Sequence, residues 1–216
     1  MFVWHDARTL DGPQNMATDE VLLRSKPKAP VLRIYGWDRP TISIGYFQSI
    51  PELEGAEIVR RWTGGGLVDH RSDLTYSLII PRSEAFASER PQVSYAEIHA
   101  VIRDALVELG FAAELAEAEK STSNGGCFAG GWAEGDVICS GRKVAGAAQR
   151  RCRFGVLHQG SIHAKGLDDP FWNLLAAKMT VKMLPFTLDP ALEPEMEALA
   201  SERYASPDWL HKRPVE

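Results

Sequence analysis

The stretch RRWTGGGLVDHRSDLTYS, residues 60–77, is the part of the sequence that most strongly indicates the fold and the function. Its three consecutive glycines remove every Cβ atom from one short segment, so a ligand can approach the backbone closely and a positive φ costs little. Arg60 and Arg61 precede the glycines, and guanidinium groups bind carboxylates and phosphates through paired hydrogen bonds. The stretch therefore predicts one wall of a site for an acyl or acyl-phosphate group. A glycine-rich hairpin with solvated arginines is the alternative.

The composition is that of a globular chain with one large domain or two small ones. The chain has 216 residues, of which 44% are hydrophobic and 25% charged, enough to bury a core without disulfides or metals. The formal net charge of -5 gives no general basic footprint for nucleic acid, although Arg150, Arg151 and Arg153 form a local basic group. No run of about 18 apolar residues is present, so no membrane-spanning helix is expected.

The three cysteines, Cys127, Cys139 and Cys152, bear on the cellular setting. Their number is odd, and their spacing lacks the close pairs that zinc sites use. The N-terminal residues contain no apolar core long enough for a signal peptide. A reducing, cytoplasmic setting is the simplest interpretation, because disulfides persist mainly in oxidising compartments.

The first part of the chain combines one helix with several short strands. Residues 15–25 carry an apolar stripe at helical spacing, with Asn15 as the expected N-cap. An Asp-Arg-Pro turn separates two β-rich segments, which predicts a hairpin. The strands expected here span residues 2–5, 31–37, 41–47, 58–62 and 74–80. In the last of these the apolar side chains alternate, which places Leu74, Tyr76, Leu78 and Ile80 on one face.

Residues 94–109 show the clearest helical pattern in the second part. Ser94 and Glu97 have the spacing of a capping box, and Gly110 follows as a C′ residue. The other elements expected are strands at residues 111–116, 136–139, 143–151 and 155–163, and helices at residues 170–177 and 193–204. Residues 120–135 form a long loop that carries Cys127, and the tail after about residue 206 is expected to be irregular.

No repeat, low-complexity tract or linker divides the chain, so residues 1–216 are expected to form a single domain. Strands and helices mix without a regular βαβ alternation, which favours an α+β fold with a mixed, largely antiparallel sheet flanked by helices. The glycine segment is not a P-loop, and neither a dinucleotide fingerprint nor a Gly-x-Ser-x-Gly elbow is present. His158 and His163 lie five apart on one expected strand, hence on opposite faces, and no metal site is expected there.

Four segments in order resemble the lipoate–protein ligase and octanoyltransferase superfamily. They are NMATDE, LRIYGWDRPTISIGYFQ, RRWTGGGLVDHRSDLTYS and GRKVAGAAQRRCRFGVLHQGSI, and they cover most of the chain from residue 15 to residue 162. The resemblance implies the catalytic fold shared with biotin–protein ligases and, more remotely, class II aminoacyl-tRNA synthetases. It also implies that the chain attaches octanoyl or lipoyl groups to one lysine of a lipoyl domain or of the glycine-cleavage H protein.

The resemblance assigns roles to the matching positions. Lys143 matches the lysine that contacts the acyl carbonyl, where a fixed positive charge stabilises a developing oxyanion. Without the family context, an exposed hairpin lysine is the simpler interpretation of this residue. The substrate-binding positions that the resemblance implies are Arg61, Gly64, Gly65, Gly66, His70, Gly146 and Ala148.

The family has two chemistries. Ligases activate free lipoate with ATP and magnesium and form an acyl-adenylate. Octanoyltransferases take octanoate from acyl carrier protein, usually through a cysteine thioester, and need no cofactor. Cys127-Phe128 and the segment HRSDLTY resemble one cysteine-dependent octanoyltransferase branch, and the Asp-x-Gly-Asn pattern common in ligases is missing. The chain also ends soon after the catalytic segments, without the accessory domain of many ligases, although some ligases carry that domain on a separate chain.

The sequence therefore predicts an octanoyl or lipoyl transferase with Cys127 and Lys143 as catalytic residues. The expected donor is acyl carrier protein, and the expected acceptor is a lipoyl domain or the glycine-cleavage H protein, with no nucleic acid or membrane partner. An incidental thiol in a loop is the alternative for Cys127. The alternative functions are an ATP-dependent lipoate–protein ligase and a non-catalytic relative that binds lipoyl domains. A biotin ligase is disfavoured because its arginine-glycine adenylate loop is not found.

Overall fold

The computed structural model describes residues 1–118, 131–167, 169–180 and 182–212, and within these ranges the strands form two sheets. The larger sheet contains, in spatial order, β11 (Leu184–Pro185), β1 (Phe2–His5), β2 (Val31–Tyr35), β6 (Leu74–Pro81), β10 (Gly155–Ile162), β9 (Arg142–Cys152), β8 (Val137–Cys139) and β7 (Ala113–Leu115). The smaller sheet contains β4 (Glu57–Arg60), β3 (Thr41–Ile44) and β5 (Val68–Asp69).

Both sheets are mixed. In the larger sheet β1 runs parallel to β2 and β11, and the pairs from β2 through to β7 are antiparallel. In the smaller sheet β3 is parallel to β4 and antiparallel to β5. The α+β fold with a mixed, largely antiparallel sheet is therefore confirmed.

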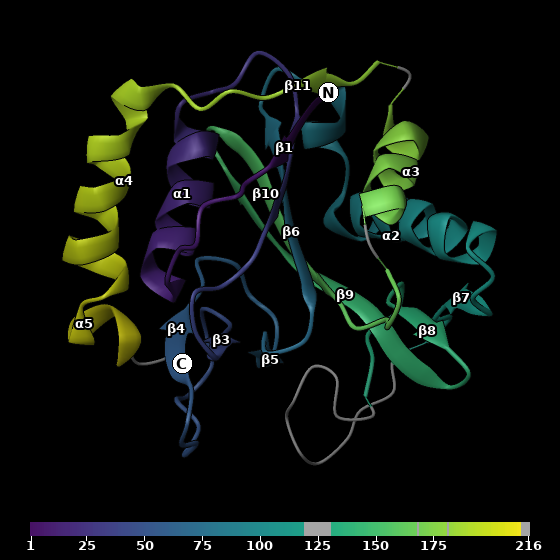
Figure 1. The fold of residues 1–216 in the computed structure, drawn as a ribbon, viewed down its shortest axis with the longest axis horizontal. Helices are drawn as coiled ribbons and strands as arrows, with labels where there is room; N and C mark the ends of the chain where they lie inside the picture. The colour runs from purple at the N-terminus through teal and green to yellow at the C-terminus, as the bar shows by residue number, and fades with distance from the viewer. Residues whose placement is uncertain (119–130, 168, 181, 213–216) are drawn as a thin grey trace.

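Helices cover both faces of the larger sheet (Figure 1). On one face α1 (Gly12–Arg24) packs on β6 and β10 and is itself covered by α4 (Glu193–Leu199) and the π-helical turn η3 (Ala200–Tyr204). On the other face lie α2 (Pro91–Glu108) and α3 (Asp169–Met179). The short helical turns are η1 (Ala85–Ser88), η2 (Pro190–Leu192) and α5 (Pro207–Leu210).

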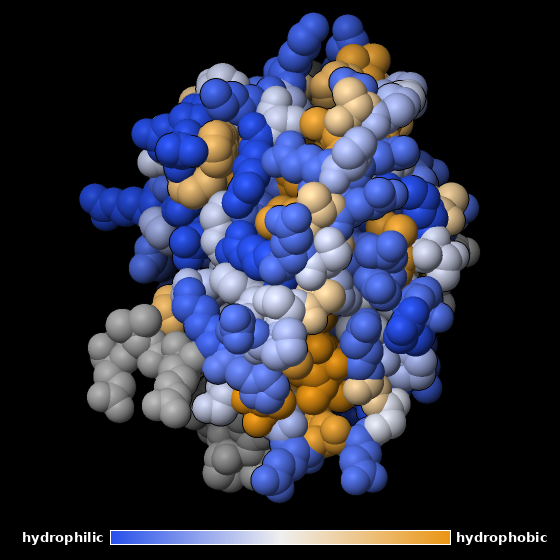
Figure 2. Space-filling view, turned by 90° about the vertical axis from the view of Figure 1, so that its left-hand side faces the viewer, coloured by the Kyte–Doolittle hydropathy of each residue, from blue (hydrophilic) through white to orange (hydrophobic). Residues whose placement is uncertain are grey.

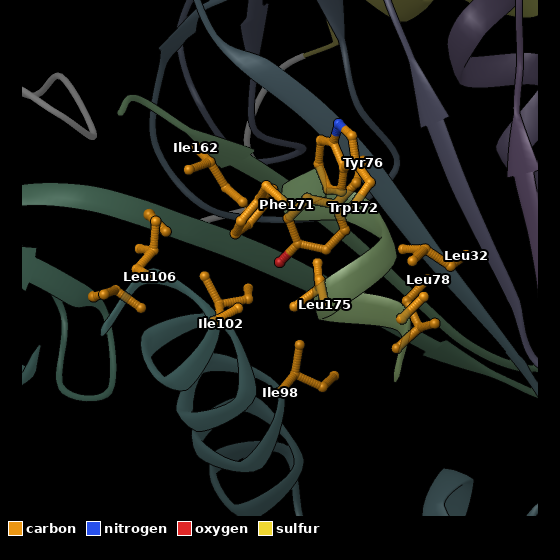
Figure 3. Close-up of a cluster of buried hydrophobic side chains, with 14 of the residues drawn as sticks. Leu32, Tyr76, Leu78, Ile98, Ile102, Leu106, Ile162, Phe171, Trp172 and Leu175 are labelled. Atoms are coloured by element: carbon orange, nitrogen blue, oxygen red, sulfur yellow. The ribbon is translucent and has the colours of Figure 1, made fainter. Parts of the chain in front are cut away.

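The apolar core is divided by the larger sheet, and β6 contributes to both sides. Tyr76, Leu78 and Ile80 face α2 and α3, where they meet side chains such as Ile102 and Phe171 (Figure 3). Ile79, from the same strand, faces the cluster that includes residues of α1 and α4. The alternation predicted for this strand is confirmed. Each fully buried Ile or Leu of this kind stabilises the fold by about 1.5–3 kcal/mol.

The expected hairpin around Asp38-Arg39-Pro40 is wrong, because the two strands enter different sheets. Both edges of β2 are already occupied, by β1 on one side and β6 on the other. β3 instead pairs with β4 and β5. The turn therefore carries the chain from the larger sheet to the smaller one, which places β3 beside the glycine segment.

Both predicted N-caps are also wrong, and in each case a proline precedes the expected start. Helix α1 begins after Asp11, whose side chain accepts the Gln14 N–H at 2.8 Å in a capping box, with Pro13 in the first turn. Asn15 is instead buried inside the helix. Helix α2 begins after Arg90 with Pro91 in its first turn, so Ser94 lies within the helix.

The tail after residue 206 is not wholly irregular. Ser206 caps α5, and its side chain accepts the N–H of Trp209. The surface on the side of α4 and α5 is mainly hydrophilic, with a few hydrophobic areas between the polar ones (Figure 2). Among the helices of the described residues, none has both the length and the apolar character needed to cross a bilayer.

Candidate active site

A narrow cleft lies where the glycine segment, β3 and the β9–β10 hairpin meet. Its floor and walls are mostly apolar or small, with a few polar groups, which suits an acyl chain. Of the residues expected from the sequence, the cleft is lined by Arg61, Gly65, Gly66, His70, Gly146 and Ala148. Gly64 does not line it, but its carbonyl oxygen accepts a hydrogen bond from the Arg61 guanidinium.

Gly65, at the centre of the glycine segment, lies against neighbouring chain segments that leave little room for a side chain. Gly65 has a φ of +82°, and a Cβ atom there would lie 3.2 Å from the Cβ of Ala148 on β9. A Cβ atom on Gly45, just after β3, would lie 2.0 Å from the Gly65 carbonyl oxygen. The three chain segments therefore meet at van der Waals distance with almost no side-chain volume between them.

Arg61 holds the glycine segment in place from within the cleft wall. Its side chain is buried, and one guanidinium nitrogen donates to the hydroxyl oxygen of Ser43 on β3. The other terminal nitrogen donates to the carbonyl oxygens of Gly66 at 2.7 Å and Gly64 at 3.0 Å. Arg61 thus places positive charge at the cleft and also fixes the backbone that lines it.

Arg60 has a different role from the one that the sequence suggested. Its guanidinium is fully buried and donates to backbone carbonyl oxygens after β3 and in α5, including those of Gln48 at 2.6 Å and Leu210 at 2.7 Å. The expectation that both arginines face a ligand is therefore wrong for Arg60. This residue joins the smaller sheet to the C-terminal helix.

His70 is the centre of a hydrogen-bonded chain along the cleft. Its Nε2 lies 2.6 Å from the Ser43 hydroxyl and its Nδ1 lies 2.8 Å from Asp73, while its ring stacks on Trp37 at 4.2 Å between centroids. Burial acts to raise the pKa of Asp73, but His70 and a hydrogen bond from Ser161 outweigh it and hold that pKa below its ordinary value. Asp73 is therefore an anion that fixes the orientation of the imidazole.

A buried network of charged and polar side chains supports the cleft from the side of α1, and sequence reasoning missed it. Asp19 accepts hydrogen bonds at 2.8 Å from Arg33, Ser77 and Gln159. Gln159 also lines the cleft and accepts the Thr63 hydroxyl. The one charged residue in the otherwise apolar strand segment VLRIY, Arg33, was the available signal.

Lys143 lies on β9, next to the cleft, and is almost completely buried. Its ammonium nitrogen is 2.7 Å from a carboxylate oxygen of Asp136. Its side chain crosses over Gly146, where a Cβ atom would stand 2.5 Å from the ammonium nitrogen. Lys143 is not among the residues that line the cleft, but its ammonium lies beside Gly146, which is. The exposed hairpin lysine is thus the wrong alternative.

Cys127 lies outside the described residues. Cys139 and Cys152 lie on β8 and β9, and each is partly buried as a free thiol. Within the described ranges, no group of three or more histidine, cysteine or acidic side chains is arranged to hold a metal ion.

Gly65→Val is expected to reduce acyl transfer by about 100-fold or more, because a 1 Å displacement near reacting groups can cost that much. The added side chain would press on Ala148 and the Arg61 guanidinium at the cleft wall. Gly55→Val is the matched control, since Gly55 has a φ of +79° with no atom within 4 Å. Both variants carry the backbone strain of about 1–2 kcal/mol, but only the first fills the cleft. Steady-state kinetics compares the two variants, and equal activities would show that the acyl group does not bind in this cleft.

The lipoyl protein ligase A/B catalytic domain is the family whose model matches the chain, over residues 11–183. Octanoyltransferase LipM of Halalkalibacterium halodurans is 30% identical over 271 aligned positions, which cover 96% of this chain and 98% of that protein.

Two solved structures show the same fold at low sequence identity. Lipoate-protein ligase A bound with ATP has a TM-score of 0.81 and 18% identity, with 97% of each chain covered. A bi-partite lipoate protein ligase, described together with its E2 lipoyl domain, from Thermoplasma acidophilum has a TM-score of 0.74 and 19% identity, covering 100% of this chain and 98% of that one. The fold implied by the sequence resemblance is thus confirmed.

Proposed function

Since the chain belongs to the lipoyl protein ligase A/B catalytic-domain family, we propose that it is an octanoyltransferase that modifies one lysine of a lipoyl domain. The observation that carries the proposal is the buried ammonium of Lys143 beside Gly146, a residue that lines a narrow, largely apolar cleft. An acyl chain in the cleft would bring its carbonyl oxygen toward this charge. The ammonium would then stabilise the oxyanion that forms when the carbonyl is attacked.

Two acyl transfers make up the reaction. In the first, the Cys127 thiolate attacks the thioester of the acyl donor, a new carbon–sulfur bond forms, and the carrier thiolate leaves and takes up a proton. In the second, the neutral amine of the acceptor lysine attacks the enzyme thioester, an amide forms as the amine nitrogen gives up one proton, and the Cys127 thiolate is released. That proton balances the one taken up by the carrier thiolate in the first transfer. Thioester exchange is nearly isoenergetic and keeps the acyl group reactive toward an amine. The role of Cys127 rests on the sequence resemblance.

Acyl carrier protein is the proposed donor, and a lipoyl domain or the glycine-cleavage H protein is the proposed acceptor. The transferase needs no cofactor. The thiolate chemistry favours a reducing, cytoplasmic setting, because oxidation of the thiol would block it.

A lipoate–protein ligase is the second candidate, and its support is the shared fold with a ligase bound with ATP. In that case ATP and magnesium would be required, and an acyl-adenylate would replace the enzyme thioester. A non-catalytic lipoyl-domain-binding relative is the third candidate. The buried Lys143–Asp136 pair argues against it, since a chain that only binds lipoyl domains has no need of an ammonium at the cleft.

A donor assay separates these candidates. The protein is incubated with an apo lipoyl domain and either octanoyl-carrier protein or free octanoate with ATP and magnesium, and the acceptor is followed by mass spectrometry. We expect octanoylation of the acceptor with the carrier donor alone. Modification only with octanoate, ATP and magnesium would show that the protein is a ligase and not a transferase. No modification with either donor would favour the non-catalytic relative.

A further inference from the structure

A small side-chain network connects Lys143 to elements on both sides of it. Asp136, just before β8, is fully buried, and one of its carboxylate oxygens accepts both the Lys143 ammonium and the N–H of Ala133, each at 2.7 Å. The other oxygen accepts the hydroxyl of Tyr95, which lies on α2. The carboxylate is thus held in one orientation by a backbone group and by a side chain from another element.

The Tyr95 hydroxyl also contacts the strand that lines the cleft. It accepts the N–H of Ala147 at 3.1 Å, and Ala147 is one of the cleft residues on β9. Burial and the neighbouring Asp136 carboxylate raise the pKa of Tyr95 well above its usual range, so the hydroxyl remains protonated and keeps donating to Asp136. One hydroxyl therefore fixes both the carboxylate that holds the lysine and the strand that lines the cleft.

The backbone next to Asp136 is shaped around the Tyr95 ring. Gly135 has a φ of +82°, and a Cβ atom there would lie 3.3 Å from the ring of Tyr95. The carbonyl of Gly135 accepts the Nδ1–H of the buried His99, one turn further along α2, at 2.7 Å. Helix α2 thus holds both the ring and the backbone that precedes the carboxylate.

We propose that Asp136 and Tyr95 are positioning residues that hold the Lys143 ammonium at the cleft for acyl transfer. This inference rests on the proposed function for its effect on turnover. An ammonium has three N–H donors, so it can bind Asp136 and an acyl carbonyl oxygen together. A lysine side chain has four rotatable bonds, and the fixed carboxylate removes most of that freedom before the acyl group arrives.

Kinetics of Asp136→Asn and Tyr95→Phe test the proposal. We expect kcat to fall about 100-fold in the first variant and about 10-fold in the second, with KM changed by less than about 3-fold, since the cleft lining keeps its side chains. The matched control is Tyr204→Phe, which removes a buried hydroxyl that donates to the buried carboxylate of Glu20, on the side of α1. This variant is expected to keep the kcat of the unaltered protein.

Chemical labelling of Lys143 gives a second measurement that does not need enzyme activity. Trace acetylation with acetic anhydride is followed at Lys143 by peptide mass spectrometry across a pH series. Loss of the carboxylate charge favours the uncharged amine, so in Asp136→Asn the alkaline rise in labelling should begin about one pH unit lower or more. Tyr204→Phe should leave the labelling profile unchanged.

The outcomes separate this proposal from the proposed function. A lower kcat together with a shifted labelling profile supports the positioning role. Unchanged kcat in both variants overturns it, and so does a lower kcat with lost thermal stability and an unshifted profile, which would indicate a purely structural role. If no acyl donor works with the unaltered protein but the profile still shifts in Asp136→Asn, the network holds the lysine as proposed and the octanoyltransferase assignment fails.

Discussion

Lys143→Ala is expected to lower kcat for acyl transfer by about 100–1000-fold, the usual loss when one donor to a developing oxyanion is removed. The ammonium carries a positive charge next to Gly146, which lines the cleft, and alanine leaves nothing in its place. Rates of octanoyl transfer to an apo lipoyl domain measure the effect. A variant as active as the unaltered protein would show that Lys143 has only a structural role.

The same substitution is expected to affect the stability of the fold. Removing one partner of a buried ion pair leaves an uncompensated charge and costs about 3–5 kcal/mol. Asp136 would retain Ala133 and Tyr95 as partners but would lose its counter-charge. Lys143→Ala is therefore expected to lower the free energy of unfolding as well as kcat.

A double variant separates the two effects. Lys143→Ala with Asp136→Asn removes both charges, so the free energy of unfolding in denaturant should recover most of the loss while acyl transfer stays low. Recovery of both stability and transfer in the double variant would contradict a direct role for the ammonium.

Lys143→Arg should restore little activity, although it keeps the charge. The lysine side chain passes so close to Gly146 that a Cβ atom there would lie 2.2 Å from its Cε. A planar guanidinium is wider than an ammonium and presents its donors in a fixed fork. It would fit this space only by moving β9 or Asp136.

The parts of the fold that local periodicity controls could be predicted from the sequence. The alternation in β6, the strands of the β8–β9–β10 meander and the helix α2 depend on neighbours a few residues away. Pairing between distant strands does not have such a local signal. The partners of β2 and β3 are decided by which sheet edges are already occupied, and this information lies far away in the sequence.

The glycine segment and Lys143 of the candidate site could be predicted from the sequence, but the side chains that hold them in place could not. The glycine run and the lysine motif are each one continuous stretch of sequence, and a family resemblance can be recognised from such stretches. Tyr95, Asp136 and the Asp19–Arg33 pair come from separate elements that only the folded chain brings together. Arg60 is the opposite case. Its position near the glycines suggested a contact with a ligand, but its guanidinium donates hydrogen bonds to backbone carbonyl oxygens instead.

The protein is expected to gain one octanoyl group on Cys127 when it is incubated with octanoyl-carrier protein and no acceptor. A cysteine-dependent transferase must pass through this thioester, and neutral hydroxylamine should release it. Intact-mass spectrometry measures the adduct, which should be absent in Cys127→Ser, together with acyl transfer to the lipoyl domain. Serine is far less nucleophilic than a thiolate at neutral pH, so residual transfer should be lower by at least about 1000-fold.

The other two cysteines provide the controls. Cys139→Ser and Cys152→Ser keep Cys127 and alter partly buried thiols on β8 and β9, so both should retain the adduct. An adduct that persists in Cys127→Ser and disappears in one of these variants would show that the substituted strand cysteine is the nucleophile. Full activity of Cys127→Ser with octanoate, ATP and magnesium would instead identify a ligase, because an acyl-adenylate can be attacked by the acceptor lysine without any enzyme thiol.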